Sequence, residues 1–159
     1  MKPKTVEKIL RRFQRLPLHY IDTSIILEPE KGEDGRHCRR YLQLVGNKYR
    51  GVIPFPVLSE LLLAITEMEK IRDRYDFLDI LMDMISVKKI AFYAPKDIGK
   101  LLIKIKELDS RIEPTDREIV ACGAEHNCDT IVTLDKNLIH NEKLESGLNV
   151  KIRHPKELL

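Results

Sequence analysis

The segment Asp129-Thr130-Ile131-Val132-Thr133-Leu134-Asp135 has the clearest strand pattern in this chain of 159 residues. Its centre is a run of β-branched residues, and β-branched side chains favour extended backbone. Just upstream, Pro114 and Thr115 open an apolar run through residue 126 that predicts a helix. A helix that leads into a short apolar strand is typical of parallel sheets covered by helices on both faces.

The same alternation continues toward both ends of the chain. Short strands are also predicted over residues 18–21, 51–56, 90–93 and 149–152, helices over 36–45, 57–70, 72–87 and 95–108, and a polar loop over 28–35. This pattern predicts an α/β fold, a single-domain three-layer sandwich around a central, mostly parallel sheet, formed by residues 18–159. Residues 1–17 are predicted to form a basic amphipathic helical extension. Its apolar positions have helical spacing and are Val6, Ile9, Leu10 and Phe13.

The composition excludes several classes of protein. Hydrophobic residues make up 43% of the chain and charged residues 33%, which argues against wholesale disorder. No apolar run approaches the roughly 20 residues of a membrane span, and the charged start lacks the apolar core of a signal peptide. With no Trp and 6% aromatic residues, base stacking is not expected to be the main chemistry. We therefore expect a cytoplasmic protein without membrane contact.

Positive charge is concentrated in the first third of the chain. Residues 1–50 carry 12 Lys and Arg against 6 Asp and Glu, whereas residues 51–159 carry 16 against 19. The basic part includes Arg36, Arg39 and Arg40, which are candidates for non-specific contacts to the phosphates of RNA. The alternative, that these side chains are solubilising surface charges, stays open at this point.

Two aspartates directly follow predicted strands. Asp22 comes after residues 18–21, and Asp135 comes after 129–134. In an open parallel sheet, ligand sites form beyond the carboxyl ends of the strands, so both residues are expected at the same edge of the sheet. Taken singly, each has a simpler explanation as a turn or helix-capping residue.

Two further acids lie near predicted helix starts. Glu60 stands among apolar residues, where an ionised carboxylate needs a partner, neutralisation or a route to solvent. A cation shared with Asp22 would satisfy it, whereas the alternative is a narrow polar stripe with Ser59 and Glu67. Asp116 lies in the first turn of the helix that begins at Pro114, where a capping box and the helix dipole explain it by themselves.

Other clusters are interpreted as structural. The four aspartates of the helix over 72–87 form one solvated face without the glycine and ligand alternation of a calcium loop. Cys122, His126 and Cys128, with His37 and Cys38, match the spacing of no zinc finger or ribbon. The three cysteines of the chain are therefore expected to be buried thiols in a reducing compartment.

Four segments resemble, in this order, the PIN domain family of small α/β nucleases, which includes the VapC-like toxin ribonucleases. The segments are Ile21-Asp22-Thr23-Ser24, Val57-Leu58-Ser59-Glu60-Leu61, Thr115-Asp116-Arg117-Glu118-Ile119-Val120-Ala121-Cys122-Gly123-Ala124 and Ile131-Val132-Thr133-Leu134-Asp135-Lys136-Asn137-Leu138. The match extends over nearly everything from residue 18 onward. The resemblance implies a catalytic acidic quartet of Asp22, Glu60, Asp116 and Asp135. It also implies neighbouring polar groups at Thr23 or Ser24, Thr133 and Asn137.

Such an acidic quartet favours a bound divalent ion. Ionised carboxylates a few ångströms apart raise one another's pKa, and a cation removes that repulsion. Oxygen ligands without histidine favour Mg²⁺ or Mn²⁺ over zinc. We expect Asp22, Asp116 and Asp135 to hold the ion, and Glu60 to orient or deprotonate the attacking water. Whether one ion or two would bind stays open.

The expected activity is that of a metal-dependent endoribonuclease, which hydrolyses RNA phosphodiester bonds. The resemblance implies either the toxin of a toxin–antitoxin pair or an RNA-processing enzyme. The partners expected are RNA, an antitoxin protein and a second copy of the chain in a homodimer. The alternative is a catalytically silent PIN-like module that binds RNA or a protein partner.

Overall fold

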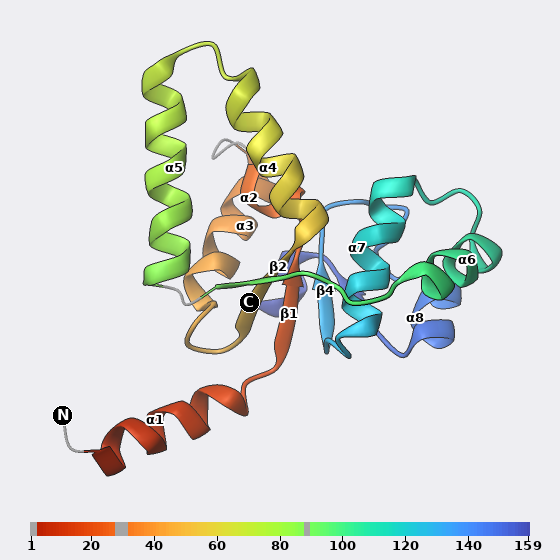
Figure 1. Ribbon diagram of the computed structural model, residues 1–159, viewed down its shortest axis with the longest axis horizontal. Coiled ribbons are helices and arrows are strands. Elements are labelled where there is room, and N and C mark those ends of the chain that lie inside the picture. Colours follow the sequence, from red (N-terminus) through yellow and green to blue (C-terminus); the bar gives the residue numbers. More distant parts are fainter. Residues whose placement is uncertain (1–2, 28–31, 88–89) are drawn as a thin grey trace.

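A computed structural model describes residues 3–27, 32–87 and 90–159, and it contains one five-stranded parallel sheet (Figure 1). The strands are β1 (Leu18–Ile21), β2 (Arg50–Pro54), β3 (Ala91–Tyr93), β4 (Thr130–Val132) and β5 (Lys151–Arg153). They lie in the order β3-β2-β1-β4-β5, and each neighbouring pair is parallel. The predicted single-domain α/β fold with a parallel sheet is confirmed.

The strand order creates a switch point between β1 and β4. From β1 the chain builds outward to β2 and β3, and then returns past β1 to add β4 and β5 on the other side. Tyr20 of β1 is in register with Val52 of β2 and with Ile131 of β4. Connections on the two sides of such a point leave in opposite directions, which opens a crevice at the carboxyl ends of the two central strands.

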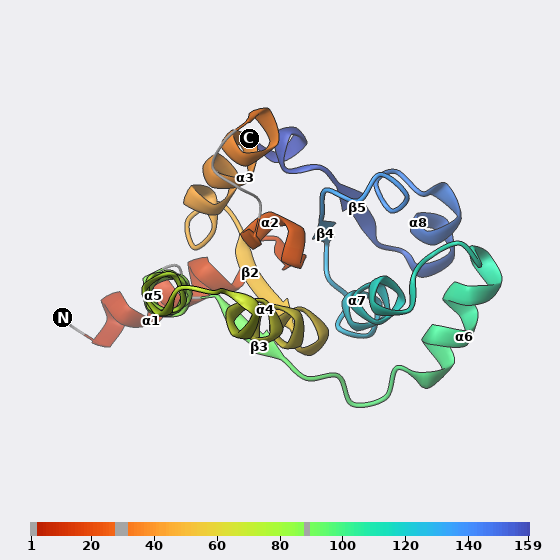
Figure 2. The same cartoon turned by 90° about the horizontal axis from the view of Figure 1, so that it is seen from above.

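Helices cover both faces of the sheet. They are α2 (Thr23–Leu27), α3 (Glu33–Leu44), α4 (Phe55–Glu67), α5 (Ile71–Ser86), α6 (Gly99–Leu108), α7 (Pro114–Glu125), α8 (Glu142–Leu148) and the 3₁₀ helix η1 (Pro155–Leu158). Viewed from above, α6, α7 and α8 group on one side of the sheet, and α3 and α5 lie on the other (Figure 2). Helices α4 and α5 form a hairpin that extends beyond the carboxyl end of the sheet (Figure 1).

The core is formed by the apolar strands and the inner faces of these helices. Tyr20, Ile53 and Ile131 are completely buried, as the apolar strand patterns predict. Gly51 of β2 allows a close approach, because a Cβ there would lie only 2.7 Å from Cγ1 of Val45. A side chain at this position would therefore displace the side chain of Val45, which directly follows α3.

Several boundaries differ from the sequence prediction for local reasons. Helix α6 begins at Gly99 rather than residue 95, because the Asp97 carboxylate accepts the Gly99 N–H at 3.1 Å and forms a turn. Helix α8 was not predicted because, of its residues, only Leu144 is buried, and it shows no apolar stripe. Part of the loop predicted over 28–35 lies outside the described residues, and its end already belongs to α3.

The first helix, α1 (Pro3–Gln14), projects from the body of the domain (Figure 1). Ile9 is 46% exposed and Leu10 is 53% exposed, so these two residues of the predicted apolar stripe are not covered by the domain, whereas Phe13 is half-buried. The side chain of Val6 lies outside the described residues. Within the described part of the chain, the structure contains no helix with both the length and the apolar character that a membrane span requires.

Candidate active site

Asp22 is the centre of the acidic site. It directly follows β1, is only 7% exposed, and begins the short helix α2 by accepting the Ile25 N–H on its backbone carbonyl at 3.1 Å. Its carboxylate accepts the Thr23 N–H at 2.8 Å, the Ser24 hydroxyl at 2.6 Å and the Thr133 hydroxyl at 2.7 Å. These three donors fix the orientation of the carboxylate at the end of the strand.

The end of β4 is linked to this carboxylate by hydroxyl groups. Thr133 is fully buried, and its oxygen accepts the Asp135 N–H at 3.0 Å while its hydroxyl donates to Asp22. The Ser24 oxygen accepts the Leu134 N–H at 3.1 Å. Two carboxyl-bearing segments that are more than 100 residues apart in sequence are therefore held together at the switch point.

Glu60 reaches the site from α4, which follows the neighbouring strand β2. Pro56 lies in the first turn of this helix, where its missing N–H costs no hydrogen bond. The Glu60 carboxylate accepts a hydrogen bond from the hydroxyl of Thr23, the residue after Asp22. The Glu60 side chain is half-buried and lines the same pocket as Asp22.

Asp116 enters from the first turn of α7. This helix runs back along the sheet to β4, so its amino end lies at the carboxyl edge. A helix dipole there favours an ionised carboxylate by about 0.3–1 kcal/mol. The pKa of Asp116 is nevertheless raised to about 7, first by burial, then by the charges of Asp135 and Asp22, a hydrogen bond with the Asp135 side chain, and the charge of Glu60. Burial, together with the crowding of the four acids, therefore outweighs the effect of the helix dipole on the pKa of Asp116.

The four acids line one open pocket of about 470 Å³. The rest of its lining comprises Thr23, Ser24, Leu27, Leu63, Ala64 and Glu67. Among the described residues, the lining contains no Lys, Arg or His that could offset the charge of the acids. Glu67 lies two turns after Glu60 on α4. From the sequence it was interpreted only as part of a polar stripe, although its spacing of seven residues from Glu60 places both side chains on the same face of α4.

The other predicted site residues are placed differently. Asn137 donates its backbone N–H to the Asp135 carboxylate at 2.7 Å, so it supports that residue while its side chain is exposed. Arg36, Arg39 and Arg40 lie on α3, where all three are exposed, and none of them lines the acidic pocket. The structure therefore brings the acids and their hydroxyl partners together but leaves these arginines outside the pocket.

The cysteines do not form a metal site. All three are free and buried, as predicted. The Tyr20 hydroxyl and Nδ1 of His126 are hydrogen-bonded to each other at 2.7 Å, which gives His126 a structural role. Burial raises the pKa of the Cys122 and Cys128 thiols to about 12, so both stay protonated and unreactive at neutral pH.

The donor atoms of the acidic pocket are of the type that a hard divalent cation prefers. The described residues of its lining offer carboxylate and hydroxyl oxygens, and none offers a nitrogen or sulfur ligand. An ion there would neutralise the charges that raise the pKa of Asp116. The fold and this site together define an α/β domain with an acidic pocket at the switch point of a parallel sheet.

The comparison with known families identifies that domain. The PIN domain profile matches residues 19–144, which is most of the chain. The chain belongs to the PIN domain family, whose members are generally nucleases that use divalent metal ions. Among curated proteins, no significant match was found.

Solved structures with the same fold come from several bacteria. VapBC2 from Rickettsia felis, bound to a DNA fragment from its promoter, is similar with a TM-score of 0.64 at 18% identity over 86% of this chain and 98% of that chain. FitAcB from Neisseria gonorrhoeae has a TM-score of 0.59 at 15% identity, covering 86% and 97%. DNA-bound VapBC from Salmonella typhimurium has a TM-score of 0.56 at 18% identity, covering 88% and 99%. At these identities the similarity shows the shared fold.

Proposed function

We propose that this PIN domain is a metal-dependent endoribonuclease that hydrolyses RNA phosphodiester bonds in its acidic pocket. One observation carries the proposal. The four carboxylates of the acidic quartet come from four separate parts of the fold and line a single pocket, and none of the described residues in its lining is cationic. Holding such groups together in ionised form is unfavourable unless a cation joins them. This arrangement supports metal-dependent chemistry on an anionic substrate.

Asp22, Asp116 and Asp135 are the proposed ligands of a Mg²⁺ or Mn²⁺ ion. When bound, the ion supplies positive charge for the phosphate in the transition state and lowers the pKa of water. The hydroxyls of Ser24 and Thr133 hold the Asp22 carboxylate in one orientation, so its position is fixed before an ion or RNA arrives.

Glu60 is the proposed residue that orients or deprotonates the attacking water. Its carboxylate is held by the Thr23 hydroxyl and faces the pocket from the α4 side. A fixed carboxylate within reach of the phosphate can accept a proton from water in the transition state. Thr23 is therefore proposed to position Glu60 rather than to contact the substrate itself.

The direct test of this activity uses labelled RNA and the matching single-stranded DNA. We expect the protein to cleave RNA internally with Mn²⁺ or Mg²⁺ and to show no cleavage in EDTA. DNA is expected to be cleaved less than RNA. Tight RNA binding without cleavage, at any metal concentration, would instead support the second candidate, a catalytically silent module that binds RNA or a protein partner.

Basic residues outside the pocket are proposed to gather the RNA. The acids repel a polyanion, whereas Arg36, Arg39 and Arg40 are exposed on α3, and the projecting α1 carries further basic side chains. Contacts of this kind are made to phosphates and carry no sequence preference.

Replacing Arg36, Arg39 and Arg40 together with Ala is expected to weaken the dependence of RNA affinity on salt. Each phosphate contact to single-stranded nucleic acid contributes about 0.7 to the slope of log K against log salt, so the slope should fall by up to about 2. Filter binding at several salt concentrations measures it. Lys100, Lys106 and Lys151, exposed on other elements, provide a control triple variant of equal charge change. An unchanged slope in the arginine variant would exclude α3 from RNA binding.

We further propose that the chain acts in the cytoplasm as the toxin of a toxin–antitoxin pair, with an RNA-processing role as the alternative. The fold shared with VapBC and FitAcB supports an antitoxin protein as partner. We also propose a homodimer in which the exposed apolar residues of α1, Ile9 and Leu10, contact a second copy. A monomeric mass at every concentration in sedimentation experiments would contradict the homodimer.

A further inference from the structure

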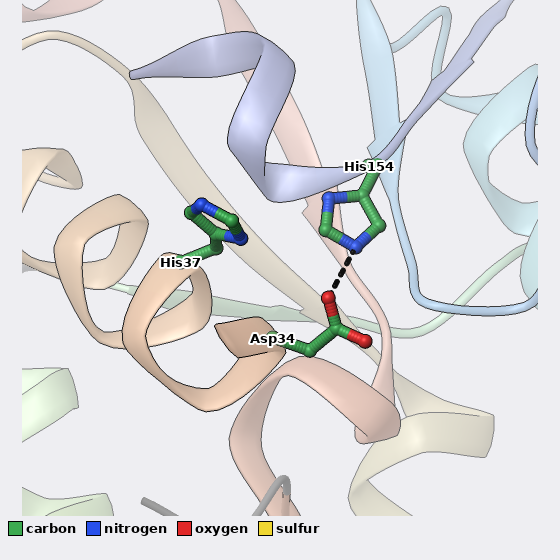
Figure 3. A group of neighbouring side chains, drawn as sticks. All are labelled: Asp34, His37 and His154. Carbon is green, nitrogen blue, oxygen red and sulfur yellow. Dashed lines mark hydrogen bonds and ion pairs between the residues drawn. The ribbon is translucent and has the colours of Figure 1, made fainter. Parts of the chain in front are cut away.

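A second group of potential metal ligands lies where α3 meets the segment after β5. Figure 3 shows Asp34 and His37 on α3 and His154 directly after β5, with their side chains directed toward one another. Asp34 and His37 are three residues apart on the helix and therefore lie on one face. One ligand atom from each of the three residues lies within 4.8 Å of the other two. None of the three lines the acidic pocket.

The imidazole of His37 has an unsatisfied polar atom. Its Nδ1 is buried, and within the described residues it has no hydrogen-bond partner. Buried polar atoms in proteins nearly always have a partner, so this ring nitrogen is available to bind a ligand. His154 is also well buried, since its side chain is only 12% exposed, and its Nε2 is hydrogen-bonded to the Asp34 carboxylate at 3.2 Å. The Asp34 side chain is 58% exposed, so the group is open to solvent on that side.

We propose that Asp34, His37 and His154 bind a transition-metal ion of the Zn²⁺ type. Two imidazole nitrogens and one carboxylate oxygen form a typical donor set for zinc and related ions. Mg²⁺ prefers oxygen ligands, so the acidic pocket and this site select different metals. The exposed side of Asp34 leaves room for water as a further ligand.

Binding through Nε2 of His154 requires a change of tautomer. Nδ1 of His154 accepts the Lys156 N–H at 3.1 Å, so in the neutral ring the proton is on Nε2, where it is donated to Asp34. When the ion takes Nε2, that proton is lost to solvent and Nδ1 takes one up, which leaves the ring neutral overall. The N–H of Lys156, an exposed residue, then turns to water.

Zinc binding is expected to cross-link α3 and the C-terminal helix η1 through the metal ion. Helix η1 is already attached to the domain through the Tyr49 hydroxyl, which donates to the Leu158 carbonyl at 2.7 Å. An ion held by both α3 and His154 would replace the single hydrogen bond between Asp34 and His154 by a stronger link at the start of η1. Ligands that bind only the folded state raise its stability.

The test is a Zn²⁺ titration of the full chain in competition with a chromophoric chelator, with Mg²⁺ in excess to occupy the acidic pocket. We expect one Zn²⁺ per chain and a higher melting temperature on its addition. His154→Asn keeps an oxygen that can cap η1 but lacks the imidazole, and His37→Leu removes the unpaired nitrogen. Each should lower the Zn²⁺ affinity more than about 100-fold. Even replacing a residue that is only hydrogen-bonded to a metal ligand commonly lowers metal affinity about 10- to 100-fold.

Two controls separate this site from other acids and histidines. His140, whose Nε2 is bonded to Glu157 at 2.8 Å, is a similar histidine–carboxylate pair outside the group, so His140→Asn should keep the zinc. Asp116→Asn should keep it too, because its carboxylate belongs to the acidic pocket. If His154→Asn does not fold, Asp34→Asn at an exposed position gives the same test. Three results would each overturn the proposal. They are an unchanged Zn²⁺ affinity in His37→Leu and His154→Asn, a loss of Zn²⁺ binding in Asp116→Asn, and a wild-type protein that does not compete with the chelator for Zn²⁺.

Discussion

Replacing Asp22 with Asn is expected to reduce metal-dependent RNA cleavage at least about 1,000-fold. Asn has nearly the same shape and can still accept the Thr23 N–H, and its NH2 can donate to the Ser24 and Thr133 oxygens once their hydroxyl hydrogens rotate away. The fold should therefore survive, while the negative charge that is needed to hold the ion is lost. Removal of a single group that stabilises a transition state commonly lowers the reaction rate about 100- to 1,000-fold. Loss of a metal ligand is expected to lower the rate at least as much.

The matched control for this variant is Asp79→Asn. Asp79 is exposed on α5, outside the acidic pocket, so the same chemical change there should leave cleavage within about twofold of the wild type. Rates are measured with purified proteins at saturating Mn²⁺, and circular dichroism confirms folding. Cleavage that persists in Asp22→Asn at the wild-type rate would mean that the acidic pocket is not the catalytic site.

Replacing Asp116 with Asn is expected to stabilise the metal-free protein at pH 8 while it abolishes cleavage. The pKa of Asp116 is raised to about 7 in the folded state, against an ordinary value of 3.8. Between these values the folded state binds more protons than the unfolded chain, so stability falls as the pH rises from about 4 to about 7. Above pH 7 the full cost of the buried charge is present. Solvent reaches this half-exposed side chain and weakens the repulsion, so we expect a gain of about 1–2 kcal/mol.

Urea unfolding in EDTA at pH 8 and at pH 4 measures this effect. The gain in the free energy of unfolding of Asp116→Asn over the wild type should be largest at pH 8. It should nearly vanish at pH 4, where the wild-type carboxyl is protonated in the folded state. Adding Mn²⁺ at pH 8 should make the wild type more stable than the variant. An ion at 100 times its Kd stabilises the wild type by about 2.7 kcal/mol, whereas the variant binds the ion poorly. A variant that is less stable than the wild type at pH 8 in EDTA would contradict the described crowding.

The sequence predicted the acidic site because chain direction limits where a strand-end residue can lie. Asp22 and Asp135 follow parallel strands, so the fold class alone places them at one edge. The sequence did not predict that β1 and β4 are adjacent in the sheet, because strand order depends on packing between helices that are distant in the sequence. Glu60 was recognised by its apolar surroundings, whereas Glu67, which lies between Thr66 and Met68 in a mixed polar and apolar stretch, was interpreted only as part of a polar stripe.

The parts that sequence reasoning missed depend on contacts over long separations or on weak local signals. Helix α8 has few buried residues and no apolar stripe, and Asn141 caps it by accepting the Leu144 N–H at 3.2 Å. Asp34 and His154 are 120 residues apart, and no spacing rule joins them. Their meeting depends on how η1 packs against α3, which only the folded chain reveals.

The most direct measurement of the central claim is the position of Mn²⁺ in crystals of the wild-type protein. The account predicts an anomalous difference peak between the carboxylates of Asp22, Asp116 and Asp135, and its absence in crystals of Asp22→Asn. Wild-type crystals at saturating Mn²⁺ with no peak in the acidic pocket would contradict the claim that these acids are gathered to hold a metal ion.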